Sequence, residues 1–413
     1  MTRILLLALA GACLWCAAEA SMADTLKPAA TSTWKSPSLN KDLVTTLYAP
    51  ADDAPQRSRA GRPGIFYLKN LAGQRAGTES DESIIADLLK EGYLVLVIDY
   101  AKDPKAVAPH TDLDIRVMRS SMGGSKTKPG IFGPQRVDGD HTYVLAEGFR
   151  LKRDILYYGN EKDGYRLDIR YPSKPKTPAP ALILNPCDNK NRMGNWVTTT
   201  YNEVIAESAM TRGYAAVQID NPVKYYKGRD PMPEVAIIIK AAIRTVRAQG
   251  KELGLSGKVG LMGFSRGSGQ AGLAGLSSDK KELEQGPHLD QSSRPDALLL
   301  HAGRMDHLLL LKTDPKFGSS YGDQFGDPVA DRKKWEEGSA AFYVTKDDPP
   351  VFLSVGDRDE YRVAQIKRMD EALTAAGVEH TLAITPNMGH RVTGDLKILA
   401  QIYDFFDKHL KGK

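Results

Sequence analysis

Residues 258–267 read Lys-Val-Gly-Leu-Met-Gly-Phe-Ser-Arg-Gly, a buried-strand pattern that runs directly into a serine between two glycines. Gly263, Ser265 and Gly267 form a G-x-S-x-G motif, and a segment rich in Gly and Ala with helical periodicity follows. Such a sharp strand-to-helix turn needs small flanking residues because its backbone is strained and closely packed. The turn raises the hydroxyl of Ser265 above the sheet. It also places the backbone N–H of Arg266 at a helix N-terminus, where it can stabilise an oxyanion.

Outward from this turn, short β-branched runs alternate with helical patterns from residue 148 to the C-terminus. The alternation predicts a mostly parallel sheet with helices on both faces. We expect eight strands, at 154–158, 165–171, 181–184, 215–219, 259–263, 297–301, 351–355 and 381–384. Helical periodicity covers 197–212, 233–248, 267–276, 361–376 and 393–410. The G-x-S-x-G turn therefore follows the fifth strand, and a tight polar turn at 161–164 predicts that the first two strands form an antiparallel hairpin.

A serine hydroxyl is a weak nucleophile at neutral pH unless a histidine removes its proton and an acid orients that histidine. After a turn of this kind, the acid and then the histidine are expected further along the chain. Residues 349–359 supply a strand that ends in Gly356, and Asp359 is the acid three positions later. His390 follows the last expected strand and precedes the final helix. The sequence thus predicts a catalytic triad of Ser265, Asp359 and His390.

From about residue 145 to the C-terminus, the chain resembles the α/β-hydrolase superfamily, with residues 263–267 as its nucleophile elbow. Within that superfamily it is similar to serine esterases of the prolyl-oligopeptidase-like and the acetyl-xylan or feruloyl esterase-like branches. The resemblance implies an eight-stranded, mostly parallel sheet flanked by helices and a two-step transfer of an acyl group through Ser265. It implies no metal and no organic cofactor.

The chain departs from this family at the loop after the third strand. Relatives often carry His-Gly-Gly-Gly there to supply oxyanion donors, whereas this chain has Asn-Pro-Cys-Asp-Asn at 185–189. Pro186 has no N–H to donate. We therefore expect the backbone N–H groups of Cys187 or Asp188 to complete an oxyanion hole with that of Arg266.

Several residues of the motif admit other interpretations. Ser265 could act as a helix N-cap, and Asp357 or Asp306 could take the place of Asp359. Cys187 could be a reactive thiol or a buried small hydrophobe, of which the second is favoured. Gly267, Gly269 and Gly272 also match G-x-G-x-x-G, but no acidic residue closes the next strand, so close helix packing explains them better than dinucleotide binding. The remaining histidines lack metal-ligand spacing and are expected at the surface or in loops: His110, His141, His288, His301, His307, His380 and His409.

The first 23 residues have the features of an export signal. Arg3 precedes an apolar run at 4–14, and small residues near position 20 offer a cleavage site. The run is too short to span a bilayer comfortably, since a transmembrane helix needs roughly 20 apolar residues. We expect a secreted or periplasmic protein in which Cys187 is the only remaining cysteine and no internal disulfide can form.

Residues 24–140 are expected to form an incomplete N-terminal α/β module, followed by the catalytic domain at 145–413. Residues 41–99 loosely parallel the opening of the catalytic domain at 170–220, so the module is either a degenerate internal copy or an ordinary βαβ unit. It contains no G-x-S-x-G motif of its own. Residues 102–135 are polar, with several Gly and Pro, and are expected to form a loop or linker.

Charge and aromatic content bear on the partners. The net charge is +5 and the pI about 8.8, but Lys and Arg are scattered among acids, which argues against a nucleic-acid partner. Trp196, Tyr321 and Trp335 offer aromatic faces of the kind that stack on sugars or phenolic acids. We therefore expect a small-molecule or polysaccharide ester with an acetyl or aromatic acyl group as substrate. The rival interpretations are a peptidase or amidase with the same triad, and an exported binding protein that has lost its oxyanion hole.

Overall fold

The computed structural model describes most of the chain in two compact units, Met1–Arg150 and Leu151–Lys413. The described residues are 26–55, 61–72, 75–106, 111, 114–115, 117–118, 130–135, 137–185, 200–222, 230–390 and 396–412. The expected export signal lies outside this set, as do Cys187, Asp188 and Trp196. No helix among the described residues is long and apolar enough to cross a membrane.

The second unit is built on an eight-stranded sheet with the order β13-β12-β11-β10-β8-β9-β7-β6. Strands β8 to β13 pair in parallel, whereas β7 pairs with β9 in antiparallel orientation. The bounds of its strands are β6 Phe149–Tyr158, β7 Tyr165–Pro172, β8 Ala179–Asn185, β9 Ala215–Ile219, β10 Leu255–Phe264, β11 Ala297–His301, β12 Val351–Gly356 and β13 His380–Thr385. This sheet confirms the predicted fold class and the place of the serine turn after the fifth strand.

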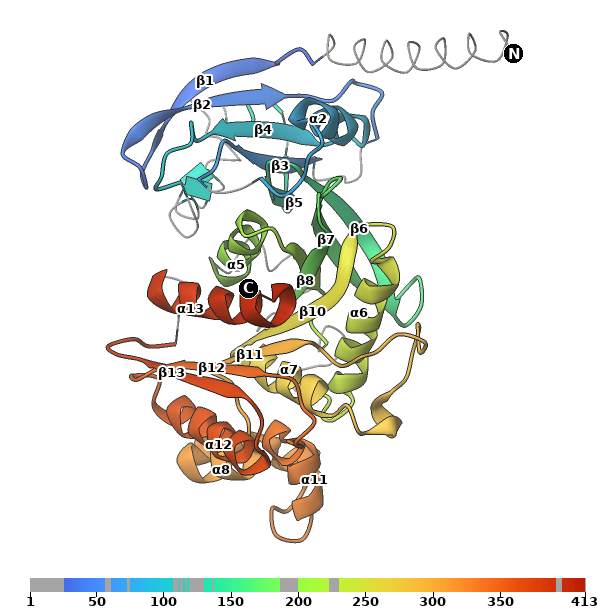
Figure 1. Ribbon diagram of the computed structural model, residues 1–413, viewed down its shortest axis with the longest axis vertical. Coiled ribbons are helices and arrows are strands. Elements are labelled where there is room, and N and C mark those ends of the chain that lie inside the picture. The colour runs from blue at the N-terminus through green and yellow to red at the C-terminus, as the bar shows by residue number, and fades with distance from the viewer. Residues whose placement is uncertain are drawn as a thin grey trace, which may run out of the picture. The chain divides into compact units, whose positions relative to one another are not determined.

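Helices cover both faces of this sheet. In Figure 1, α5 and α13 lie over one face, and α6, α7 and α12 lie over the other. Their bounds are α5 Thr200–Thr211, α6 Val235–Gln249, α7 Arg266–Leu276, α12 Glu360–Ala376 and α13 Leu396–Phe406, and a π-helical turn, η4 Asp407–Lys411, extends α13. Between β11 and β12 lie the shorter helices α8 His307–Thr313, α9 Pro315–Gly318, η2 Ser319–Tyr321, α10 Gly322–Phe325, α11 Arg332–Glu337 and η3 Ala340–Phe342, and η1 Lys281–Leu283 precedes β11.

The central strands form because their residues are apolar on both faces. β8, β11 and β12 are buried along their whole length, as parallel strands covered by helices must be. β10 begins at Leu255, four residues before the predicted start at residue 259. Residues 256–258 belong to the strand but are exposed, so they give no hydrophobic signal. β6 likewise begins at Phe149, before the predicted start at residue 154. Most of its first residues are only half-buried, so their pattern does not indicate a strand.

The first unit contains a five-stranded sheet with the order β1-β2-β4-β3-β5. Its elements are β1 Ala30–Ser36, β2 Lys41–Tyr48, β3 Arg62–Lys69, α2 Asp81–Lys90, β4 Leu94–Asp99 and β5 Val137–Ala146. β5 pairs with β3, so the unit extends past the boundary at 140–145 that the sequence suggests. β1 is not predicted from the sequence, because this edge strand is mostly exposed and lacks an apolar pattern.

The two sheets share an arrangement. The order β1-β2-β4-β3-β5 has the same pattern as β6-β7-β9-β8-β10, with β2 antiparallel to β4 as β7 is to β9. The turn from helix to strand is also alike, since Gly92 and Gly213 both have a positive φ, of 88° and 80°. Internal duplication predicts such a likeness, and the duplication itself stays a prediction.

Candidate active site

Ser265 lies in a strained turn between β10 and α7. Its φ of 54° and ψ of −120° are a conformation that a residue with a side chain adopts only at a cost, of about 1–3 kcal/mol. The turn is held on both sides, because its N–H donates to the carbonyl of His301 at 2.9 Å and its carbonyl accepts from the N–H of Ser268 at 3.0 Å. The side chain caps nothing in α7, so the interpretation of Ser265 as a capping residue is wrong.

Glycines permit the close approach of α7 to the sheet that this turn requires. A Cβ at Gly263 would lie 2.6 Å from Cα of Ser268 and 2.7 Å from the carbonyl oxygen of Gly267. A Cβ at Gly269 would lie 2.6 Å from the carbonyl oxygen of Arg304. Contacts this short involve backbone that cannot move aside. A Cβ at Gly272 would lie 3.0 Å from Cβ of Ala340, so packing accounts for two of the three glycines of the G-x-G-x-x-G pattern, Gly269 and Gly272.

The structure brings Ser265, His390 and Asp359 together. Nε2 of His390 lies 2.9 Å from Oγ of Ser265, and Nδ1 of His390 lies 2.7 Å from Oδ2 of Asp359. A carboxylate only accepts hydrogen bonds, so Nδ1 carries the proton and Nε2 of the neutral ring is the acceptor. This tautomer leaves Nε2 ready to take the hydroxyl proton of the serine.

Asp359 is fixed as an anion. It is 8% exposed, and its other oxygen accepts from a guanidinium nitrogen of Arg362 at 3.0 Å. Burial alone would raise the pKa of Asp359, but the hydrogen bond with His390 and the charge of Arg362 outweigh it and hold the pKa below its usual value. The carboxylate therefore stays ionised at neutral pH and orients the imidazole.

The two alternative acids have other partners. Oδ1 of Asp357 accepts from the N–H of Met388 at 3.2 Å. Asp306 is the N-cap of α8, where it accepts from the N–H of Leu309 at 2.9 Å. The carboxylates of Asp357 and Asp306 thus accept hydrogen bonds from backbone N–H groups, and Asp359 is the acid that contacts His390.

The oxyanion donors are described only in part. Arg266 is the first residue of α7, so its N–H is one of the amides that the helix leaves without an internal acceptor. Cys187 and Asp188 lie outside the described residues. The end of β8 is tied to the same helix turn, because the side-chain amide of Asn185 donates to the carbonyl of Gly267 at 2.9 Å.

A buried carboxylate lies beside the side chain of Arg266. Asp230 is 3% exposed, and its Oδ1 lies 3.3 Å from Nε of Arg266. Burial holds the pKa of Asp230 above its usual value, and the charges of Arg266 and Arg304 offset this only in part. Arg304 in turn donates to the hydroxyl of Tyr321 at 2.7 Å. A charged and hydrogen-bonded network thus adjoins the residue that follows the nucleophile.

Tyr321 and Trp335, expected as stacking surfaces for substrate, are buried. They are 4% and 1% exposed, and both pack on Phe325, with centroid distances of 5.7 and 5.2 Å. Nε1 of Trp335 donates to the carbonyl of Gly326 at 3.3 Å. These rings form the interior of the segment between β11 and β12, so the predicted role as stacking surfaces is wrong. Trp196 lies outside the described residues.

Two histidines that sequence analysis assigned to the surface or to loops are buried. His301 is 1% and His307 2% exposed, and burial lowers their pKa values to about 4 and about 3. Both rings are neutral at pH 7. His301 ends the strand Ala-Leu-Leu-Leu-His, and a polar residue at the carboxyl end of an apolar parallel strand is the signal that could have drawn attention to it.

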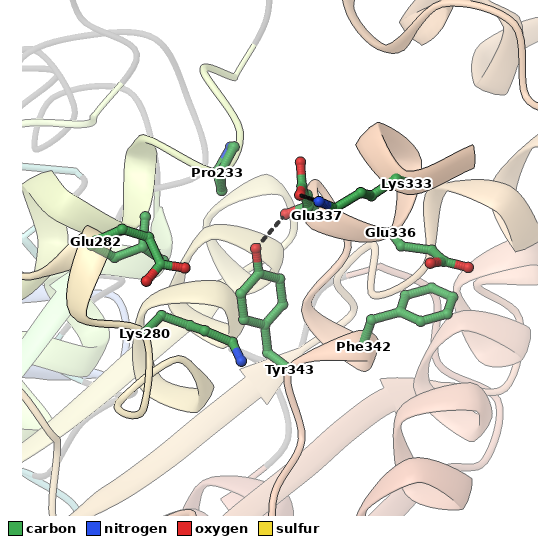
Figure 2. A pocket seen from close by; sticks show the side chains of 9 residues that line it. Pro233, Lys280, Glu282, Lys333, Glu336, Glu337, Phe342 and Tyr343 are labelled. Carbon is green, nitrogen blue, oxygen red and sulfur yellow. Dashed lines mark hydrogen bonds and ion pairs between the residues drawn. The ribbon is translucent and has the colours of Figure 1, made fainter. Parts of the chain in front are cut away.

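A hollow of about 590 Å³ lies elsewhere in the second unit, and Figure 2 shows it. Its walls come from η1, α11, η3 and neighbouring residues: Pro233, Lys280, Glu282, Leu283, Lys333, Glu336, Glu337, Phe342 and Tyr343. The hydroxyl of Tyr343 donates to the carbonyl of Glu337 at 2.9 Å. None of the triad residues lines this hollow, so it is not the catalytic pocket.

A Ser–His–Asp triad at the carboxyl edge of a mostly parallel sheet, with the serine on a strand-to-helix turn, defines a serine hydrolase of the α/β-hydrolase fold. The chain belongs to the BD-FAE family, whose model matches residues 167–373, half of the chain. The matched range includes Ser265 and Asp359. Family, fold and triad together make the protein a serine-dependent hydrolase of carboxylic esters.

Solved structures show the same fold. A truncated carbohydrate esterase from gut microbiota is similar at 21% identity with a TM-score of 0.54, over 63% of this chain and 96% of that one. Esterase B from Lactobacillus rhamnosis is similar at 17% identity with a TM-score of 0.51, over 65% and 88%. A bifunctional GH43-CE protein of Bacteroides eggerthii matches at 24% identity and a TM-score of 0.54, over 63% of this chain and 35% of its own. A comparison with curated protein sequences found no match.

Replacing Gly263 by alanine tests the packing of the elbow. Because the new Cβ would meet backbone on α7, we expect Gly263→Ala to lower the free energy of unfolding by about 3 kcal/mol. Gly322→Ala is the matched control, since a Cβ at Gly322 meets nothing within 4 Å and its φ of −55° suits any residue. Urea unfolding of the two variants should separate them clearly, and equal stability would contradict the packing argument.

The pair Asp359→Asn and Asp357→Asn tests which acid serves the histidine. An amide at 359 can donate to Nδ1 and so favour the wrong tautomer, and we expect kcat to fall by about 10³–10⁴-fold. Asp357→Asn keeps an oxygen that can accept from Met388, so its kcat on p-nitrophenyl acetate should stay near that of the wild type. The assignment fails if the two variants lose activity equally.

Proposed function

We propose that the protein is an exported esterase that removes acyl groups, above all acetyl groups, from carbohydrates. The observation that carries the proposal is the pair of distances at His390, 2.9 Å to Ser265 and 2.7 Å to Asp359. A nucleophile, base and acid within hydrogen-bond reach of one another are what acyl transfer to serine requires.

The reaction has two halves. Oγ of Ser265 attacks the ester carbonyl carbon while Nε2 of His390 takes the hydroxyl proton, and the carbonyl oxygen becomes an oxyanion. The N–H of Arg266 stabilises that charge, with Cys187 or Asp188 as the second donor. The C–O bond to the alcohol then breaks, and His390 returns the proton to the departing alkoxide. Water repeats the sequence on the acyl-serine, releasing the acid and restoring Ser265.

The carbohydrate part of the proposal has two supports. Two of the similar structures are described as a carbohydrate esterase and as a bifunctional GH43-CE protein. The export signal expected in the first 23 residues would bring the enzyme to polymers outside the cell. An aromatic acyl group has less support than a small one, because the rings of Tyr321 and Trp335 are buried against Phe325.

Labelling with a fluorophosphonate tests whether Ser265 is activated. We expect one adduct, located on Ser265 by peptide mass spectrometry, because an unassisted serine hydroxyl does not react at a useful rate. His390→Ala should abolish labelling, and His380→Ala, which alters a histidine paired with Asp370, should leave it intact. Unmodified Ser265 in folded wild-type protein would favour an exported binding protein that has lost catalysis.

A panel of substrates tests the chemical class. We expect kcat/KM on acetylated xylo-oligosaccharides to exceed the value on feruloyl esters and on p-nitrophenyl acetate, since sugar contacts add binding energy that is used in the transition state. An aminoacyl anilide tests the peptidase interpretation. Equal rates on all the esters would remove the basis for a carbohydrate substrate, and cleavage of the anilide alone would make the protein an amidase.

A further inference from the structure

His301 contacts both the nucleophile and the base of the triad. As the last residue of β11, it accepts the N–H of Ser265 through its backbone carbonyl at 2.9 Å. Nε2 of its ring lies 3.1 Å from the carbonyl oxygen of His390. The two catalytic residues come from segments 125 positions apart in sequence, and both are held by this one residue.

The direction of each hydrogen bond follows from the chemistry of the groups. The carbonyl of His390 can only accept, so Nε2 of His301 must carry the hydrogen. In a neutral ring Nδ1 is then an acceptor, and Oγ of Ser354 on β12 lies 3.2 Å away to donate to it. Burial keeps the ring neutral, because it lowers the pKa of His301 to about 4. Ser354, His301 and His390 thus form a directed chain of hydrogen bonds.

The surroundings leave His301 little freedom to move. Its strand is buried throughout, and its ring packs on Phe264 at a centroid distance of 5.9 Å and faces the ring of His390 at 6.4 Å. On the next strand, the carbonyl of Ser354 accepts the N–H of Ala302 at 2.8 Å. A donor fixed in this way can set the position of the loop that carries His390.

We propose that His301 is a positioning residue of the esterase reaction, which fixes the backbone of His390 so that Nε2 of that histidine faces Oγ of Ser265. It touches neither substrate nor reacting atoms and acts through His390. The inference rests on the proposed function, since it concerns the same triad. Its effect should appear in kcat and in the rate of serine labelling, with KM almost unchanged, because substrate contacts are not altered.

His301→Gln and His301→Asn form the deciding pair. Both replace the ring by an amide, but the Gln nitrogen is as many bonds from the backbone as Nε2 of histidine, whereas that of Asn is one bond shorter. We expect His301→Gln to keep kcat on p-nitrophenyl acetate within about threefold of the wild type, and His301→Asn to lose about 10–100-fold. His307→Asn is the control, because His307 is equally buried but contacts Ser339 and aromatic rings. It should lower the melting temperature without a comparable loss of kcat.

A double-mutant cycle shows whether His301 acts through His390. In a His390→Ala background, His301→Asn should cause no further loss of the residual rate. Equal kcat for the Gln and Asn variants, or an undiminished further loss in that background, would overturn the inference. Fluorophosphonate labelling of the wild type keeps the two proposals apart. If the wild type is not labelled, the esterase function fails, and if it is labelled while His301→Asn labels as fast, only the role of His301 fails.

Discussion

The catalytic edge depends on how closely α7 approaches the end of β10 and the turn that follows β11. The approach is possible because residues 263 and 269 are glycines. A Cβ at either position would lie within 2.7 Å of backbone atoms. Ser265 takes up the resulting strain with its φ of 54°. Strain of this kind persists only where surrounding structure fixes it, and here hydrogen bonds hold both the N–H and the carbonyl of the serine. The amides at the start of α7 and the reactive hydroxyl are thereby presented on the same turn.

The parallel sheet brings residues that are far apart in the sequence together in one site. Asn185, Ser265, His301 and Asp359 follow or end neighbouring parallel strands, so their side chains meet at one edge without long loops. Hydrogen bonds hold the polar groups on this edge, since Asn185 donates to the carbonyl of Gly267 and His301 contacts the backbone of both Ser265 and His390. Across the edge these residues follow the order of their strands, β8, β10, β11 and β12. β9, which lies between β8 and β10 in the chain, is on the other side of β8 in the sheet.

Much of this arrangement could be predicted from sequence, because the sheet strands are continuous apolar runs and the elbow has a rigid pattern of small residues. Asp359 could be chosen over Asp357 from its spacing to Gly356, and the structure joins it to His390. Periodicity did not reveal β1, whose residues are mostly exposed, or the roles of buried groups such as His301. The burial of Trp335 was not predicted either, because the type of an aromatic residue does not tell whether its ring packs in the core or faces solvent.

In the segment between β11 and β12, His307, Tyr321, Phe325 and Trp335 pack on one another. Tyr321, Phe325 and Trp335 also belong to the same buried cluster as Leu298 and Leu300 of β11. A change inside this segment therefore also changes the packing of the sheet beneath it. In mechanical terms, the segment and the strand ends that carry the triad are parts of one body, so a cavity opened at Trp335 is expected to loosen the sheet as well as the segment.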